Sequence, residues 1–223
     1  MYTVQCDFDD TITDSNVAEV LKRAFASEQW HRIEAQYSVG QFNVEESNRR
    51  QFALVRASKR RIQQYVGRTI VVRPGFRQFV DYCRRAGLGF AIVSSGLDLY
   101  IEPVLRKLGL LDLERYSGRG RVTDHGIVVD YIDPWGIELK EGFKLACLGY
   151  LRQRGRPIIY IGDGLSDIAA AMKADYVIAR DSLDEHFRSR SLSHFTFDNF
   201  YDVRQIVEDY IAGQESLMAQ SPA

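Results

Sequence analysis

Apolar residues gather in four short runs that predict buried β-strands. Each run is rich in Val, Ile and aromatic residues and ends in polar or glycine residues, which is typical of parallel strands covered on both faces. The four runs are Tyr2 to Cys6, Gly89 to Ser95, Pro157 to Gly164 and Asp175 to Ala179.

Segments between these runs have the periodicity of amphipathic helices. In residues 75–87, Phe76, Phe79, Val80 and Cys83 share one helical face, and Gly87 follows as a stop. Residues 143–155 and 198–213 show similar patterns, and in the second we expect Asp198 as N-cap and Gly213 as the end. Strands that alternate with helices predict an α/β fold, a doubly wound parallel sheet with helices on both faces.

Residues of about 13 to 72 interrupt this alternation. They are polar and helix-favouring, contain no clear strand, and are too many for one crossover helix. We therefore predict a helical cap, residues 14–72, inserted after the first strand of a core that comprises residues 1–13 and 73–213. Residues 214–223 are expected to form a flexible tail. Residues 118–136 contain turn residues at 124–126 between β-branched runs, which predicts a hairpin.

Composition narrows the class of protein. The 223 residues carry a formal net charge of −1, which gives no electrostatic reason to expect nucleic acid as a partner. Cys6, Cys83 and Cys147 are odd in number and widely spaced, so we expect reduced thiols rather than disulfides or a zinc site. With no basic leader and no long apolar stretch, the expected protein is soluble, cytoplasmic and without a membrane partner, and its oligomeric state stays open.

Chemically versatile side chains stand where the predicted strands end. In a doubly wound sheet these ends form the ligand-binding crevice. Crowded carboxylates repel one another, so a fold gains nothing from them unless a cation or a reaction requires them. A hard-cation site, a nucleophile, a proton shuttle and a cationic clamp are the groups that phosphoryl transfer needs. The residues concerned are Asp7, Asp9, Thr11, Ser94, Ser95, Lys144, Asp163 and Asp167.

These residues resemble a known set of motifs. "DFDDT" (7–11), Ser94, Lys144 and "GDGLSD" (162–167) resemble, in order, the four motifs of the haloacid dehalogenase (HAD) superfamily of phosphatases. The helical segment resembles the cap of the phosphoserine-phosphatase-like branch. The resemblance covers most of the chain and implies a Rossmann-like catalytic core, a Mg²⁺ cofactor and an aspartyl-phosphate intermediate.

Other segments resemble a narrower group. Residues 73–105, 177–187 and 200–210 are similar to bacterial methionine-salvage phosphatases that act on 2-hydroxy-3-keto-5-methylthiopentenyl-1-phosphate. Members of that group carry a cysteine-rich stretch just before the motif-three lysine, whereas "IDPWGIELKEGF" (132–143) contains no cysteine. This difference does not affect the residues expected to carry out the reaction, but it bears on which substrate the protein would use.

The two catalytic residues are predicted from the first motif. Asp7 is the expected nucleophile. Asp9 lies on the same side of an extended segment and would protonate the leaving alkoxide and then deprotonate the attacking water. Asp10 faces the other side and is expected to be structural. Thr11 is grouped with the phosphate-binding residues, and its hydroxyl is expected either to orient Asp9 or to serve a turn.

Metal and phosphate ligands complete the expected site. Asp163 would join Asp7 and Asp9 in holding Mg²⁺, Asp9 through the backbone carbonyl that the family pattern implies. Asp167 would hold a metal-bound water, or would serve only as an acid in the first turn of a helix. Ser94 and Lys144 are the expected phosphate ligands, with Ser95 and Lys140 as their alternatives.

The expected protein is a Mg²⁺-dependent phosphomonoester hydrolase that acts on a small metabolite. The methionine-salvage substrate and phosphoserine are the two candidates. A non-catalytic, receiver-like phosphate-binding domain is the alternative of another class, but it would need neither the second acid, Asp9, nor a cap. Apolar candidates for a roof over the substrate are Phe25, Trp30, Phe42 and Phe52.

Overall fold

A seven-stranded sheet organises the molecule. The computed structural model describes the backbone of residues 1–220 and the side chains of residues 1–214. The strand order is β4-β3-β2-β1-β5-β6-β7, and all neighbours are parallel except β3 and β4. The strands are β1 (Thr3–Cys6), β2 (Gly89–Leu97), β3 (Glu114–Thr123), β4 (Gly126–Asp130), β5 (Ile158–Gly162), β6 (Tyr176–Ala179) and β7 (Phe195–Thr196). The four predicted strands and the hairpin at 124–126 are confirmed.

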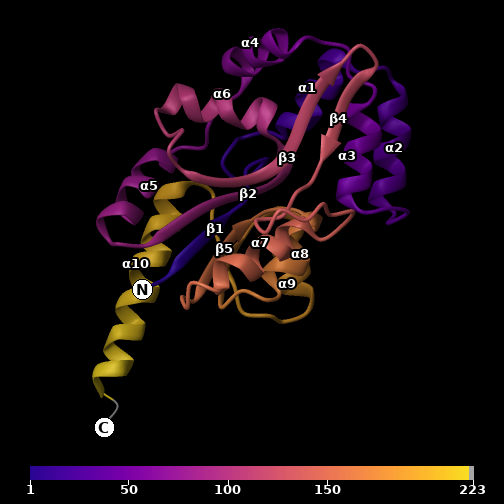
Figure 1. Ribbon diagram of the computed structural model, residues 1–223. Helices are drawn as coiled ribbons and strands as arrows, with labels where there is room; N and C mark the ends of the chain where they lie inside the picture. The colour runs from indigo at the N-terminus through magenta and orange to yellow at the C-terminus, as the bar shows by residue number, and fades with distance from the viewer. Residues whose placement is uncertain (221–223) are drawn as a thin grey trace.

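Helices cover both faces of this sheet, as predicted. On one side lie α5 (Phe76–Arg85), α6 (Asp98–Leu108) and α10 (Phe200–Gln220). On the other lie α7 (Phe143–Arg152), α8 (Ile168–Ala171) and α9 (Asp181–Ser189), with the short 3₁₀ helix η1 (Leu165–Asp167) before α8 (Figure 1). Strand β1 pairs with β2 on one edge and with β5 on the other, so the residues that follow it lie at the centre of the sheet's carboxyl end.

The segment between β1 and α5 consists of four helices. They are α1 (Val17–Phe25), α2 (Gln29–Ser38), α3 (Val44–Phe52) and α4 (Lys59–Thr69). An isolated bridge between Thr13 and Val72 brings the two ends of this segment together. Helix α3 packs against β4 and against α2, and α4 packs against α6 and α1 (Figure 1). We propose that residues 14–72 act as one cap over the core.

Two boundary predictions at the C-terminal helix are wrong. Asn199, not Asp198, caps α10, because its side-chain oxygen accepts from the backbone N–H groups of Tyr201 and Asp202. Gly213 does not end the helix, which continues to Gln220. Residues 214–220 of the expected tail are therefore helical, and residues 221–223 lie outside the described residues.

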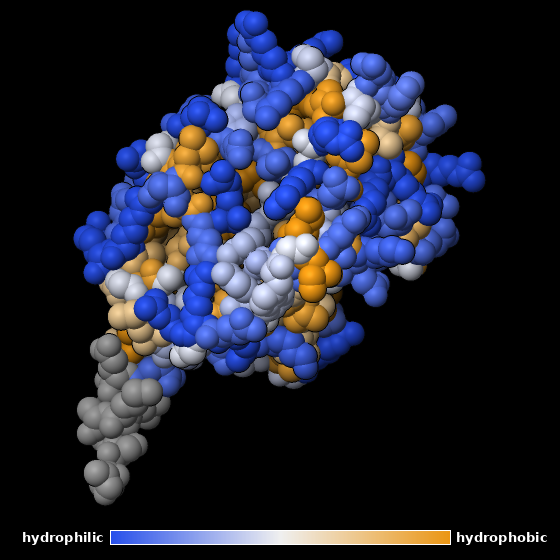
Figure 2. Space-filling model, viewed as in Figure 1, coloured by the Kyte–Doolittle hydropathy of each residue, from blue (hydrophilic) through white to orange (hydrophobic). Residues whose placement is uncertain are grey.

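The surface and the thiols agree with the composition. The face in Figure 2 is mostly hydrophilic, and its apolar side chains stand in small patches. Cys6, Cys83 and Cys147 are buried and unpaired. Within residues 1–220, none of the helices combines the length and hydropathy that crossing a bilayer requires.

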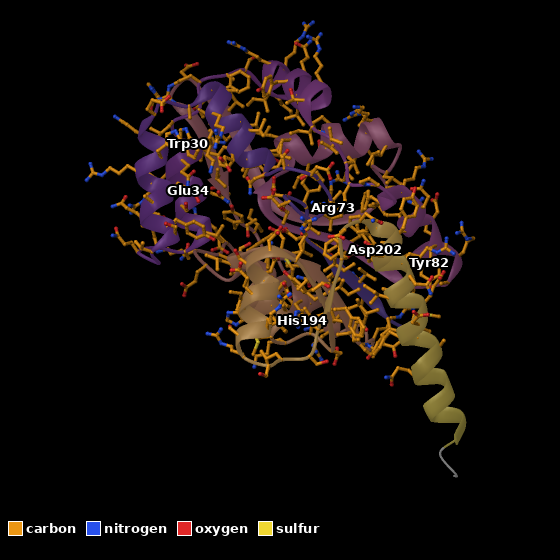
Figure 3. The ribbon with its side chains drawn as sticks, turned by 180° about the vertical axis from the view of Figure 1, so that it is seen from behind. Trp30, Glu34, Arg73, Tyr82, His194 and Asp202 are labelled. Carbon is orange, nitrogen blue, oxygen red and sulfur yellow. The ribbon has the colours of Figure 1, made fainter. Side chains whose placement is uncertain are left out.

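The loop after β1 is held by one buried arginine. Asp10 adopts a left-handed backbone conformation with φ of 57°, which turns the chain sharply. The Arg73 guanidinium, 9% exposed, donates to the carbonyls of Asp10 at 2.7 Å, Thr11 at 2.8 Å and Thr13 at 3.2 Å. It also donates to the carbonyl of Asp198 at 3.1 Å, so it ties this loop to the start of α10 (Figure 3).

Replacing Arg73 should destabilise the fold. In Arg73→Met, several buried carbonyls lose a charged donor, and we expect the free energy of unfolding to fall by about 2–4 kcal/mol. Urea denaturation measures this change. Arg77→Met is the matched control, because Arg77 is exposed and donates to the carbonyl of Leu108 alone. Equal unfolding midpoints for the two variants would show that Arg73 does not hold the loop.

Candidate active site

A cavity of about 610 Å³ lies at the carboxyl end of the sheet. Its floor comes from the ends of β1, β2 and β5 and from α7, and its walls come from α1, α2 and α3. Asp7, Asp9, Ser94, Ser95, Lys144 and Asp163 all line it. Six of the eight residues that the sequence singled out therefore line one hollow, whereas Thr11 and Asp167 do not line it.

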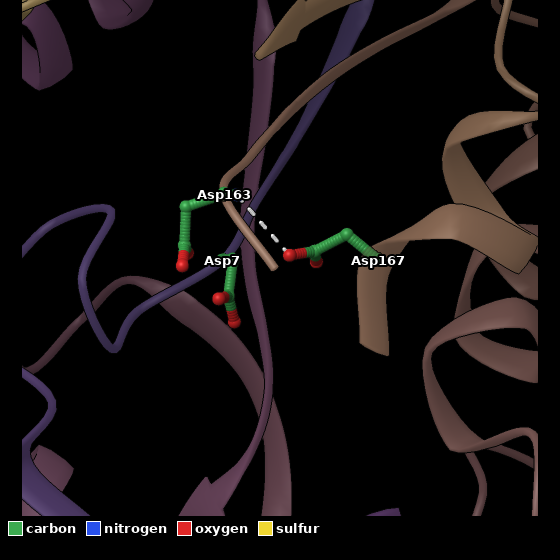
Figure 4. Close-up of side chains that lie close together, drawn as sticks. All are labelled: Asp7, Asp163 and Asp167. Atoms are coloured by element: carbon green, nitrogen blue, oxygen red, sulfur yellow. Dashed lines mark hydrogen bonds between the residues drawn. The ribbon is translucent and has the colours of Figure 1, made fainter. Parts of the chain in front are cut away.

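Asp7 and Asp163 follow adjacent parallel strands and face one another. Asp7 follows β1, and its backbone N–H continues the ladder by donating to Ile161 at 2.9 Å. Carboxylate oxygens of Asp7, Asp163 and Asp167 lie within 4.8 Å of one another (Figure 4). Burial is the main cause that raises the pKa of Asp7, to about 7, although Lys144 opposes it. Burial, together with the charges of Asp7 and Asp167, also raises the pKa of Asp163.

Lys144 is the cation of this acidic cluster. Its ammonium lies 2.7 Å from Oδ1 of Asp7 and 2.6 Å from Oδ1 of Asp167. Burial lowers its pKa, but the two carboxylates outweigh burial and raise the pKa above its ordinary value. Lys140, the alternative, is exposed and does not line the cavity. Of these two lysines, Lys144 is therefore the one that faces the cavity.

Asp9 is held by the first turn of the cap. Its Oδ1 accepts from the backbone N–H of Val17 at 2.8 Å and of Ala18 at 3.3 Å, at the start of α1. Its Oδ2 accepts from the Tyr100 hydroxyl at 2.8 Å. Burial raises the pKa of Asp9 to about 6, although these donors oppose the rise. A carboxyl with such a pKa exchanges a proton near neutral pH, as a general acid and base must.

Asp167 is fully buried and its oxygens are already taken. Oδ1 accepts from Lys144 and from the Tyr160 hydroxyl, and Oδ2 accepts from the backbone N–H of Asp163 and of Gly164. It does not line the cavity. Its evident effect is to position Lys144 and the loop after β5, whereas the predicted contact with a metal-bound water stays a prediction.

Thr11 contacts the acid that follows β5. Its hydroxyl donates to Oδ1 of Asp163 at 2.7 Å, so of the two roles expected for Thr11, that of orienting Asp9 is wrong. The left-handed turn at Asp10 ends the strand-like alternation and carries Thr11 across to the end of β5. Its side chain is fully buried and does not line the cavity, so it orients Asp163 instead. A phosphate contact from Thr11 stays a prediction.

Ser94 and Ser95 both reach the cavity from the end of β2. The Ser94 hydroxyl oxygen accepts from the backbone N–H of Gly96 at 2.9 Å. The Ser95 hydroxyl is buried without a hydrogen-bond partner among the described residues. Both side chains remain candidates for contacting a phosphate.

The donor set suits a hard cation. Around the cavity floor, one ammonium, Lys144, lies among three carboxyl groups, of which Asp7 and Asp167 are buried and Asp163 is partly buried, so acidic groups outnumber basic ones there. Asp7 and Asp163 offer carboxylate oxygens of the kind that Mg²⁺ prefers. The side chains of Asp9 and Asp167 are occupied by other donors, which leaves Asp7 and Asp163 as the side chains that would hold the ion.

A comparison with profiles of known protein families identifies the family of this chain. The profile of the haloacid dehalogenase-like hydrolases matches residues 4–172, which include every motif described above. The chain belongs to this family.

Relatives of this HAD hydrolase are phosphatases by name. The 2-hydroxy-3-keto-5-methylthiopentenyl-1-phosphate phosphatase of Brevibacillus brevis is 32% identical over 208 residues, which cover 91% of this chain and 93% of the relative. The enzyme of the same name from Geobacillus kaustophilus is 32% identical over 203 residues, 89% of this chain and 91% of the relative. A solved phosphoserine phosphatase, trapped as an analogue of its phospho-aspartyl intermediate, has the same fold with a TM-score of 0.70. It is 22% identical and covers 93% of this chain and 97% of that one.

Sequence reasoning missed two residues that shape this HAD site. Tyr100, on α6, reaches the cavity to hold Asp9, but in sequence it is an aromatic residue of an amphipathic helix. Asn48, on α3, donates to the Ser95 carbonyl at 2.8 Å and so joins the cap to the end of β2. No local sequence signal marks either contact, because both join segments distant in the chain.

Removing the Tyr100 hydroxyl should impair proton transfer specifically. In Tyr100→Phe, Asp9 loses a donor that orients it, and we expect kcat for alkyl phosphates to fall about 10- to 100-fold. The loss should be smaller for p-nitrophenyl phosphate, whose leaving group needs no proton. Steady-state kinetics on both substrates measure the difference. The control variant is Tyr65→Phe, because Tyr65 lies in the cap and packs on Phe25. Equal losses on the two substrates would contradict an action through Asp9.

Proposed function

We propose that this HAD hydrolase is a Mg²⁺-dependent phosphatase of small phosphomonoesters that forms an aspartyl-phosphate on Asp7. One observation carries the proposal: a nucleophilic carboxylate, a second carboxyl of raised pKa and a buried ammonium face the same cavity. The three groups supply attack, proton transfer and charge neutralisation, which are the requirements of this reaction.

Attack would come from the oxygen of Asp7 that Lys144 leaves free. Lys144 holds Oδ1 of Asp7, so Oδ2 can form the new bond to phosphorus as the bond to the leaving oxygen breaks. The same ammonium would neutralise charge on the phosphoryl group. Mg²⁺, when bound by Asp7 and Asp163, would screen the repulsion between the carboxylate and the phosphate.

Asp9 would move the protons of both half-reactions. As an acid it would protonate the leaving alkoxide, and as a base it would take a proton from the water that attacks the aspartyl-phosphate. Its two oxygens are fixed by α1 and Tyr100, so the carboxyl cannot rotate away between the two steps. This fixed orientation suits a group that must serve twice.

The substrate would be enclosed between the cap and the sheet. Trp30, one of the expected roof residues, lines the main cavity, and Phe42 lines a smaller one beside it. Phe25 and Phe52 instead pack within apolar parts of the fold. The names of the relatives favour the methionine-salvage substrate 2-hydroxy-3-keto-5-methylthiopentenyl-1-phosphate, and the fold keeps phosphoserine as the alternative. The proposed setting is the cytoplasm, where buried thiols such as Cys6 stay reduced.

Substitution of the two acids separates their roles. Asp7→Asn should abolish turnover of every phosphomonoester, because the amide cannot attack phosphorus. Asp9→Asn should lower kcat by about 10²- to 10⁴-fold for alkyl phosphates and less for p-nitrophenyl phosphate. Phosphate release across a panel of phosphomonoesters, with circular dichroism as a check on folding, measures both effects. Near-normal turnover by Asp7→Asn would exclude Asp7 as nucleophile.

Removing divalent cations should abolish activity reversibly. We expect excess chelator to stop phosphate release and added Mg²⁺ to restore it, because the cavity floor has more negative than positive charge. Ca²⁺ should substitute poorly, since its larger coordination shell would let it bind the nucleophilic carboxylate through both oxygens. Full activity in excess chelator would rule out the metal-dependent mechanism.

A further inference from the structure

A buried lysine in the cap faces the same cavity from the side opposite the sheet. Lys22 is 5% exposed and lines the cavity together with Ala18, which lies one turn earlier on α1. The backbone N–H of Ala18 holds Asp9, so Lys22 belongs to the same rigid helix as the group that holds the proton shuttle. This places it on the leaving-group side of the reaction, whereas Lys144 lies on the phosphoryl side.

One side of the cavity in the cap is polar. We call it the polar wall and define it as Lys22, Glu34, Ser47 and Gln51. Lys22 donates to Glu34 Oε2 at 3.3 Å and to Gln51 Oε1, and it lies 5.0 Å from the centre of the Trp30 ring. The Gln51 amide in turn donates to Glu34 at 2.9 Å. Figure 3 shows Trp30 and Glu34 one turn apart on α2. All four wall residues line the cavity.

A stabilising role alone does not explain a buried ammonium here. Burial lowers the pKa of Lys22, the sign of a desolvated cation, and Glu34 only partly offsets it. The Glu34 side chain is 43% exposed, so solvent weakens its attraction for Lys22 and the pair offsets little of the cost of burying the ammonium. An ammonium has three N–H donors, and the described residues accept two of them. The remaining donor is available to a ligand in the cavity.

We infer that Lys22, held in place by Gln51, recognises an anionic oxygen on the leaving alcohol of the substrate. The inference rests on the proposed phosphatase function and specifies its substrate class: small phosphomonoesters that carry a carboxylate or an enolate near the ester carbon. Lys144 then meets the phosphoryl group and Lys22 meets the second negative group, so two buried ammoniums match a substrate charged at both ends. An alkyl phosphate without that oxygen leaves Lys22 without its ligand.

The test compares Lys22→Met with a matched control, Lys59→Met, which makes the same change at an exposed position of the cap. Three kinds of substrate are used. Propyl phosphate has an uncharged leaving group, phosphoserine and 2-phosphoglycolate carry a carboxylate, and 2-hydroxy-3-keto-5-methylthiopentenyl-1-phosphate can form an enolate. For the anionic substrate that the wild type hydrolyses best, we expect Lys22→Met to lower kcat/KM about 10- to 100-fold, mainly by raising KM. Propyl phosphate should change less than about 3-fold, and Lys59→Met should resemble the wild type.

A second variant protects the test against misfolding. Lys22→Gln keeps a donor without the charge, should fold, and should show a smaller loss in the same direction; it carries the test if Lys22→Met does not fold. Equal losses on propyl phosphate and the anionic substrates, or an unchanged ranking of substrates, would overturn the inference and leave the proposed function intact. Failure of the wild type to hydrolyse any phosphomonoester would instead overturn the proposed function, and the inference with it.

Discussion

The attraction between the Lys144 ammonium and two buried carboxylates is the interaction on which this site depends. Without Lys144, the fold would hold Asp7, Asp163 and Asp167 together with no positive charge among them. Burial, and after it the neighbouring carboxylates, raise the pKa of Asp7 and Asp163. The repulsion among the carboxylates is opposed by the hydrogen bonds of Asp167 and by those through which Arg73 holds the loop after β1. The sheet therefore tolerates a repulsive arrangement, which the proposed cation would relieve on binding.

The cap contributes to the chemistry as well as to enclosure. Its first helix, α1, provides the backbone donors that hold Asp9, and the same helix carries Lys22 on the cavity wall. Any movement of α1 would displace the proton shuttle and the proposed recognition residue together. Asn48 adds a direct bond from α3 to the end of β2. In the proposed mechanism, proton transfer and substrate recognition would thus be coupled through one element of the cap.

The sequence predicted best what depends on local pattern. The strands β1, β2, β5 and β6 are short apolar runs, and the acids after β1 and β5 meet the serines of β2 because parallel strands end at one edge. The strand β7 has only two residues, too few for a recognisable period. Gly213 was a weak stop signal, since one glycine costs a helix only about 1 kcal/mol. Thr11 was misplaced because the turn at Asp10 requires a backbone angle that the alternating pattern does not reveal. Lys22 resembles a solvated helix residue until α2 and α3 pack around it.

The claim that Asp7 becomes phosphorylated is tested most directly by trapping the intermediate. Wild-type protein and Mg²⁺ would be mixed with a phosphomonoester that the protein hydrolyses, and the reaction would be quenched in acid within one turnover. The protein would then be digested and its peptides examined by mass spectrometry. The account predicts that the peptide containing Asp7 gains the mass of one phosphoryl group, that Asp9→Asn accumulates more of it when the substrate is p-nitrophenyl phosphate, and that Asp7→Asn shows none. Rapid phosphate release with no modified Asp7 peptide in either the wild type or Asp9→Asn would contradict it.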